Sequence, residues 1–117
     1  MNIRLHACKK FSDNRGDLVQ VFKNSFLQSY HQNFGQVYYI SFNNKGIIRG
    51  NHFHKNQEEC FCVSAGSVRI ILKDLDSGEI LDRIFNAEEA VMIAISKNVV
   101  HTLISESDFA LVLSFST

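Results

Sequence analysis

Short runs of β-branched and aromatic residues, separated by turn-forming residues, recur along most of the chain. Apolar runs of this length are typical of β-strands. They predict nine short strands, at residues 18–22, 36–42, 47–54, 60–64, 67–72, 79–85, 91–95, 99–104 and 109–115. Only residues 25–33 have a composition that could form a helical turn or two. Many short strands at close spacing predict an all-β fold, either a sandwich or a barrel.

The charge balance and the apolar runs limit the partners that the chain can have. Twelve Lys and Arg residues balance twelve Asp and Glu residues, so the net charge is zero with histidine neutral. A neutral chain without a basic run lacks the electrostatic footprint of a nucleic-acid-binding protein. The longest apolar run, residues 90–95, is far shorter than a membrane span, and the first residues lack the apolar core of a signal peptide. We therefore expect neither a nucleic-acid nor a membrane partner.

Length and cysteine content favour one cytoplasmic domain. The 117 residues, 45% of them apolar, are enough for a single hydrophobic core. The three cysteines, Cys8, Cys60 and Cys62, are an odd number, whereas a secreted domain of this size usually pairs its cysteines evenly. We expect a single domain over residues 1–117 with reduced thiols.

Imidazole and carboxylate side chains cluster in residues 46–66. Alternate residues of a strand share a face, so His52 and His54 are expected to point the same way. Glu59 lies in the next predicted strand, and it can approach the two histidines if the strands are antiparallel neighbours. Such a convergence predicts either a metal site or an acid/base site. Cys60 and Cys62 are expected to point away from it.

The same segment resembles the first motif of the cupins, Gly-x5-His-x-His-x4-Glu-x6-Gly. Every spacing fits, at Gly46, His52, His54, Glu59 and Gly66. The resemblance implies a small all-β cupin domain, that is, a jelly-roll β-barrel or sandwich.

The second cupin motif, Gly-x5-Pro-x-Gly-x2-His-x3-Asn, is only partly present. His101 fits its histidine, but Ser96 stands in place of the proline and Ser105 in place of the asparagine. The chain contains no proline at all.

A closer resemblance, over roughly residues 10–115, is to the sugar-nucleotide 3,4-ketoisomerases. It rests on DNRGDL at 13–18, VYYI at 37–40, RGNHFH at 49–54 and VVH at 99–101. These small cupins act on dTDP-4-keto-6-deoxyglucose. The Arg-Gly-x-His core also resembles the dTDP-4-keto-rhamnose 3,5-epimerases and the cupin domain of capsule-assembly reductases.

The resemblance implies that His52 and His54 are catalytic and transfer protons at the sugar, with Tyr39 beside them. Moving a ketone from C4 to C3 requires loss of a proton at C3 and delivery of one at C4 through an enediol. A base that titrates near neutrality, such as histidine, suits the first step. A donor such as arginine, tyrosine or protonated histidine suits the enediolate oxygen.

Four further residues are implied to bind the substrate. Arg15, through the resemblance of its Asp-x-Arg-Gly turn, and Arg49 are expected to contact the nucleotide phosphates or the developing oxyanion. For Arg49 there is also a physical reason, because an inward-facing arginine needs an anionic partner. His101 and Glu59 are expected to line the same cavity. The expected ligand is a dTDP-linked keto-sugar, in deoxysugar or surface-polysaccharide biosynthesis.

Several alternatives remain open at this stage. No metal or cofactor is expected, but zinc or another divalent metal could be bound by His52, His54, Glu59 and His101. The chain could instead be a 3,5-epimerase, or a cupin that binds a sugar nucleotide without catalysis. The family resemblance implies a homodimer that exchanges or pairs N-terminal strands, and Cys60 and Cys62 would suit such an interface.

Overall fold

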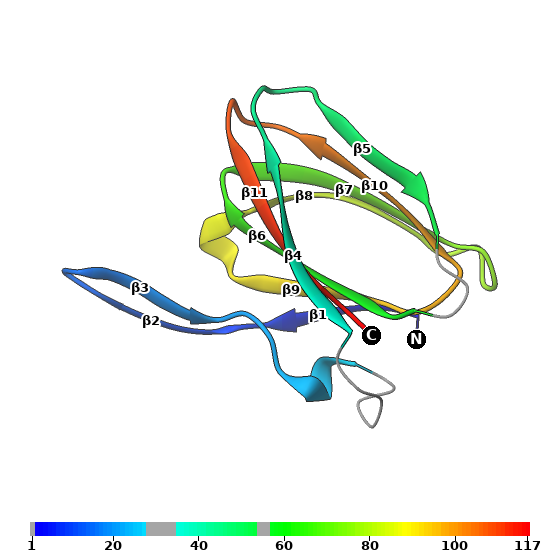
Figure 1. Ribbon diagram of the computed structural model, residues 1–117, viewed down its shortest axis with the longest axis horizontal. Helices are drawn as coiled ribbons and strands as arrows, with labels where there is room; N and C mark the ends of the chain where they lie inside the picture. The colour runs from blue at the N-terminus through cyan, green and yellow to red at the C-terminus, as the bar shows by residue number, and fades with distance from the viewer. Residues whose placement is uncertain (1, 28–34, 54–56) are drawn as a thin grey trace.

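The computed structural model describes residues 2–27, 35–53 and 57–117, with the backbone alone at Asn24, Asn51 and His52. Nearly all regular structure in this part of the chain is β-strand (Figure 1). The strands are β1 Ile3–Ala7, β2 Lys9–Asp13, β3 Gly16–Gln20, β4 Gln36–Phe42, β5 Ile48–His52, β6 Glu59–Ala65, β7 Ser67–Asp74, β8 Ile80–Asn86, β9 Val91–Ile95, β10 Val99–Ser105 and β11 Ala110–Ser116. Two short 3-10 turns, η1 Asn24–Phe26 and η2 Ala87–Glu89, interrupt them.

Two antiparallel sheets face each other and enclose the core (Figure 1). One sheet has five strands in the order β1-β9-β6-β11-β4, and the other has four in the order β5-β10-β7-β8. Apolar side chains at every second position of these strands fill the space between them, among them Phe42, Phe61, Ile70, Leu72 and Phe85. This arrangement confirms the predicted all-β jelly roll.

The hydrophobic pattern located most strands of the two sheets. The predicted strands at 36–42 and 91–95 coincide with β4 and β9. The pattern did not predict β1 and β2, where basic and polar residues interrupt the apolar ones. No helical segment in the described ranges is long and apolar enough to span a membrane.

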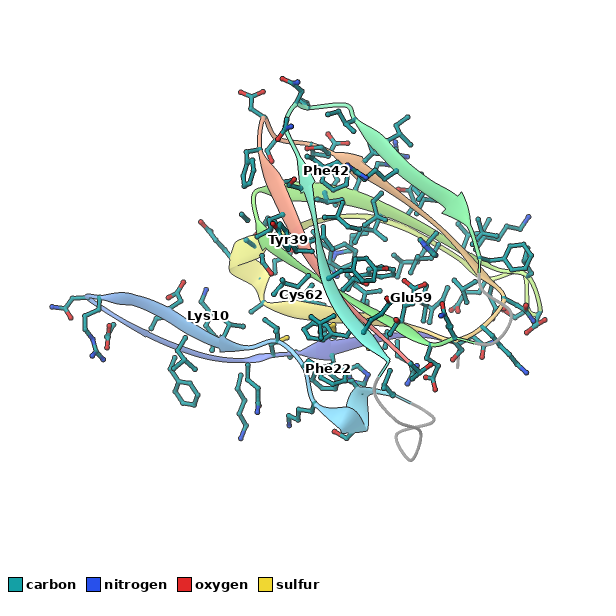
Figure 2. All side chains as sticks on the ribbon, in the orientation of Figure 1. Lys10, Phe22, Tyr39, Phe42, Glu59 and Cys62 are labelled. Atoms are coloured by element: carbon teal, nitrogen blue, oxygen red, sulfur yellow. The ribbon has the colours of Figure 1, made fainter. Side chains whose placement is uncertain are left out.

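The N-terminal segment covers the outer face of the five-stranded sheet. Cys60 and Cys62, on that face, are buried against Phe22 and Phe26 (Figure 2). Burial raises the pKa of the Cys60 thiol to about 12 and that of Cys62 to about 11. The two cysteines therefore pack within the chain as inert apolar groups, and the expectation that they would suit a dimer interface is wrong.

Where β1 packs against η1, a histidine of β1 should make the stability of the fold depend on pH. The His6 ring stacks on Phe26 with ring centroids 4.5 Å apart. Burial, and then the nearby Arg4 guanidinium, lower the pKa of His6 from its ordinary value of 6.5. The Arg4 guanidinium is itself paired with Glu58 at 3.1 Å.

We expect acidification to weaken the fold through His6. Because the folded ring resists the proton that unfolded His6 accepts, its contribution is complete above its ordinary pKa and is lost as the pH falls below it. Denaturant unfolding of wild type and His6→Gln, at about pH 7.5 and about pH 5.5, measures this contribution. The wild type should lose more free energy of unfolding than the variant. Equal losses in both proteins would show that His6 is not responsible.

A two-stranded hairpin formed by β2 and β3 projects from the body of the protein (Figure 1). Phe11 and Leu18 face each other across it, and each is 64% exposed. Its tip carries Asp13, Asn14 and Arg15.

Candidate active site

A cavity of about 550 Å³ opens between the two sheets, on the side where the edge strands β4 and β5 lie. Four strands from both sheets supply its walls. The lining residues are Tyr38, Tyr39, Ile40, Ser41, Arg49, Gly50, Phe61, His101 and Leu103. A partly apolar wall with a few converging polar groups is typical of a small-molecule site.

His101 is the buried histidine of this cavity. It lies on β10 with 3% of its surface exposed, and its ring centroid is 5.3 Å from that of Phe61 on the opposite sheet. The backbone register places His52 on β5 directly opposite His101. Two histidine positions therefore lie opposite each other across the β5–β10 pair, although the second cupin motif, to which His101 belongs, is incomplete.

A β-bulge sets this register. His101 pairs with His52, but the next residue of β10, Thr102, pairs with Gly50, so Asn51 is the additional residue on β5. Gly50 has a φ of +104°. A Cβ atom at this position would lie 2.5 Å from the carbonyl oxygen of His101. Only glycine fits here, which explains the Arg-Gly-x-His pattern physically.

Arg49 is placed at the mouth of the cavity. It is the cross-strand partner of the buried Leu103, and its guanidinium lies over the Phe42 ring, 5.8 Å from the centroid. No carboxylate in the described part of the chain pairs with it. A guanidinium in this position is available for an anionic ligand.

The structure brings Tyr38 into the site, a residue that the sequence analysis did not select. Tyr38 shares the inward face of β4 with Ile40 and Phe42, and its phenol donates a hydrogen bond to Oε2 of Glu59 at 3.3 Å. Burial is the main cause that raises the pKa of Tyr38, and the Glu59 carboxylate adds to it. The phenol therefore stays protonated at neutral pH and can act as a donor.

Tyr39 lies at the rim of the same cavity, on the alternate face of β4, and is 69% exposed. The alternation along β4 was the signal that distinguishes the two tyrosines: Tyr38 is in phase with Ile40 and Phe42, and Tyr39 is not.

Glu59 is buried, with 2% of its surface exposed, and is not among the residues that line the cavity. The condition that the strands of Glu59 and of the histidines be antiparallel neighbours is not met, because β6 belongs to the five-stranded sheet and β5 to the four-stranded sheet. Glu59 is connected to the site within the five-stranded sheet, where its carboxylate accepts the hydrogen bond from Tyr38 on β4.

Besides Glu59, the described structure does not place Arg15, His54 or the side chain of His52 in the cavity. Arg15 is at the tip of the projecting hairpin, where it pairs with Asp13 at 2.6 Å. His54 lies outside the described residues, as does the side chain of His52.

The metal alternative requires His52, His54, Glu59 and His101, and only the last two have described side chains. These two come from opposite sheets, and the Glu59 carboxylate accepts a hydrogen bond from Tyr38. Within the described ranges, no three His, Cys, Asp or Glu side chains are grouped closely enough to hold a metal ion. Metal binding at this site stays an untested alternative.

Comparison with known families identifies the family of the chain. Residues 11–117 match the polysaccharide biosynthesis C-terminal domain family. The chain belongs to that family. No curated protein matches this member of the polysaccharide biosynthesis C-terminal domain family in sequence.

Solved structures similar to this family member are sugar epimerases and ketoisomerases. The dTDP-4-dehydrorhamnose 3,5-epimerase of Sulfolobus tokodaii is 26% identical with a TM-score of 0.84, over 100% of this chain and 70% of that one. The sugar 3,4-ketoisomerase QdtA of Thermoanaerobacterium thermosaccharolyticum is 26% identical with a TM-score of 0.81, over 98% and 80%. The 3,5-epimerase of Bacillus anthracis is 21% identical with a TM-score of 0.84, over 98% and 71%. These matches confirm the resemblance to the cupin-fold sugar-nucleotide isomerases.

Proposed function

We propose that the chain is a sugar-nucleotide isomerase that moves the ketone of a dTDP-4-keto-6-deoxy-hexose from C4 to C3. The observation that carries this proposal is the cavity itself, in which His101, Tyr38 and Arg49 converge beside the apolar groups Ile40, Phe61 and Leu103. Structures of QdtA with TDP, and of a histidine-to-asparagine variant of QdtA with TDP-4-keto-6-deoxyglucose, support the substrate class.

The proposed reaction needs one base, one acid and a site for negative charge. His52, with His54, takes the proton from C3, and the electron pair forms an enediolate with its charge on the C4 oxygen. Tyr38 or His101 donates a hydrogen bond to that oxygen, and Arg49 binds an anionic group of the substrate. The C4 oxygen then takes the proton that the C3 hydroxyl loses, and a proton is delivered to the C4 carbon, which leaves the ketone at C3 and a hydroxyl at C4.

Product analysis of the wild type in D2O tests the reaction. A ketoisomerase exchanges protons at C3 and C4 and moves the ketone, whereas a 3,5-epimerase exchanges C3 and C5 and leaves the ketone at C4. NMR of the product from dTDP-4-keto-6-deoxyglucose distinguishes the two. Tight binding without exchange at any carbon would instead identify a non-catalytic sugar-nucleotide-binding cupin.

The tyrosine role is assigned to Tyr38 because it lies on the inward face of β4, its phenol is hydrogen-bonded to Glu59, and it is 37% exposed, against 69% for Tyr39. Tyr38→Phe should lower kcat by about 100-fold, as expected for loss of an acid or an oxyanion donor. Tyr39→Phe, a matched change one residue further along the strand, should cause a much smaller loss. Steady-state kinetics with the same substrate gives the comparison, and the reverse order would return the role to Tyr39.

A homodimer is part of the proposal, and the hairpin supports it. A two-stranded hairpin is at best marginally stable alone in water, and Phe11 and Leu18 expose apolar surface on it. Packing the hairpin against a second copy would bury these groups. It would also give Arg15 a place in the cavity of the partner, which it does not have within its own chain.

Mixing two inactive variants tests this arrangement. Arg15→Ala and His52→Asn should each be nearly inactive alone. If Arg15 acts in the cavity of the other subunit, equal mixing with subunit exchange should restore up to about a quarter of wild-type activity, because half the dimers are mixed and each has one intact site. Failure to regain activity, with mixed dimers shown by native mass spectrometry, would show that Arg15 does not act in the cavity of the other subunit.

A further inference from the structure

Two serines lie where β11 passes between the tyrosine and the carboxylate of the site. In the five-stranded sheet, β11 separates β4 from β6. Ser114 of β11 is paired with Tyr38 on one side and Phe61 on the other, and Ser116 is paired with Glu59. These serines share the inward face of β11 with Ala110 and Val112, so the inward stripe of this strand changes from apolar to hydroxyl-bearing at the site.

The Tyr38 side chain can reach Glu59 only by crossing β11. Neighbouring strands are about 4.8 Å apart, so β4 and β6 are separated by about twice that distance. The 3.3 Å hydrogen bond between the phenol and Glu59 therefore passes over the inward face of β11, where Ser114 and Ser116 stand. Large side chains at these two positions would occupy the space of the phenol.

The hydroxyls of both serines are buried and lack ordinary hydrogen bonds. Ser114 is 0% exposed and Ser116 2%, and neither Oγ atom has a hydrogen-bond partner among the described residues. Ser114 nevertheless lies close enough to Tyr38 to act against the rise in the pKa of its phenol. An unsatisfied buried hydroxyl is unfavourable, and an apolar residue would be more stable here. Catalytic hydrogen bonds are often long in the absence of substrate and shorten when it binds.

We infer that Ser114 and Ser116 are positioning residues that leave a trough for the Tyr38 side chain and hold its phenol against Glu59. Ser114 faces the phenol, and Ser116 stands beside the Glu59 carboxylate. The pair acts on the substrate only through Tyr38. The effect of the serines on catalysis therefore rests on the proposed function, whereas their positioning of the Tyr38 side chain does not.

Two variants of Ser114 separate the trough from the hydroxyl. Ser114→Ala keeps the space and removes the hydroxyl, whereas Ser114→Val also fills the space. Ser114→Val should displace the phenol from its hydrogen bond to Glu59, and one hydrogen bond is worth about tenfold in rate, so we expect a loss in kcat of about tenfold with KM nearly unchanged. Ser114→Ala leaves that bond in place and should cause a smaller loss. Ser64→Val is the matched control, because Ser64 is exposed on the other face of the same sheet.

A second measurement follows Tyr38 without substrate. The chain has three tyrosines, so protein with 13C at the tyrosine Cζ atom gives three resonances, which Tyr→Phe variants assign. Ser114→Val and Ser114→Ala should shift the Tyr38 resonance, and Ser64→Val should not. If neither Ser114 variant shifts it, the inference is wrong. If only Ser114→Val shifts it, the hydroxyl role is overturned and the trough is supported. If the Ser114 variants shift the Tyr38 resonance but the wild-type protein shows no turnover, the proposed function is refuted and the positioning of Tyr38 by the serines is not.

Discussion

Replacing His52 with asparagine should abolish turnover of dTDP-4-keto-6-deoxyglucose while the protein remains folded. A positioned general base contributes about 100-fold to 10,000-fold to the rate, and asparagine keeps a similar shape without a group that can exchange a proton near neutrality. The β5–β10 pairing at this position is made by the backbone, so the substitution leaves the strand in place. We expect a loss in kcat of at least about 1,000-fold.

A matched histidine makes this result specific. His6→Asn changes the same residue type on β1, on the outer side of the five-stranded sheet and away from the cavity. It should retain wild-type kcat at neutral pH. Thermal unfolding of both variants checks that the fold survives. Full activity in folded His52→Asn protein would remove His52 from the proposed mechanism.

The hydrophobic pattern is sufficient to predict most of the strands but not how they are arranged into sheets and a site. Strands such as β4 and β9 alternate or run apolar over their full length, and the sequence predicts them accurately. Adjacent predicted strands do not have to be neighbours in space, however. The strands of His52 and Glu59 follow each other in the sequence but lie in different sheets. No local pattern in the sequence could reveal this.

The tyrosine and arginine positions show two further reasons why the sequence alone does not predict the site. Choosing between Tyr38 and Tyr39 requires the face of β4, which the phase with Ile40 and Phe42 supplied and which family resemblance did not. Arg15 was expected in the cavity from its motif alone. The structure places it at the tip of the projecting β2–β3 hairpin, and the motif alone contains no information on where that hairpin lies relative to the cavity.

Gly50→Ala should be the most damaging single substitution of a non-polar residue in the site. The left-handed backbone at φ +104° strains any residue with a Cβ atom by about 1–2 kcal/mol. The added methyl group would also lie 2.5 Å from the carbonyl oxygen of His101, so β5 must move away from β10. We expect a loss of at least about 2 kcal/mol in the free energy of unfolding.

The same movement should impair catalysis out of proportion to stability. The bulge at Asn51 holds His52 opposite His101, and a displacement of about 1 Å in a catalytic group can lower the rate about 100-fold. Gly78→Ala is the control, since Gly78 also has a positive φ of +78° but an added Cβ meets no atom within 4 Å. Denaturant unfolding and kcat/KM are measured for both variants. Equal losses in the two would mean that the close approach of Gly50 to His101 does not set the geometry of the site.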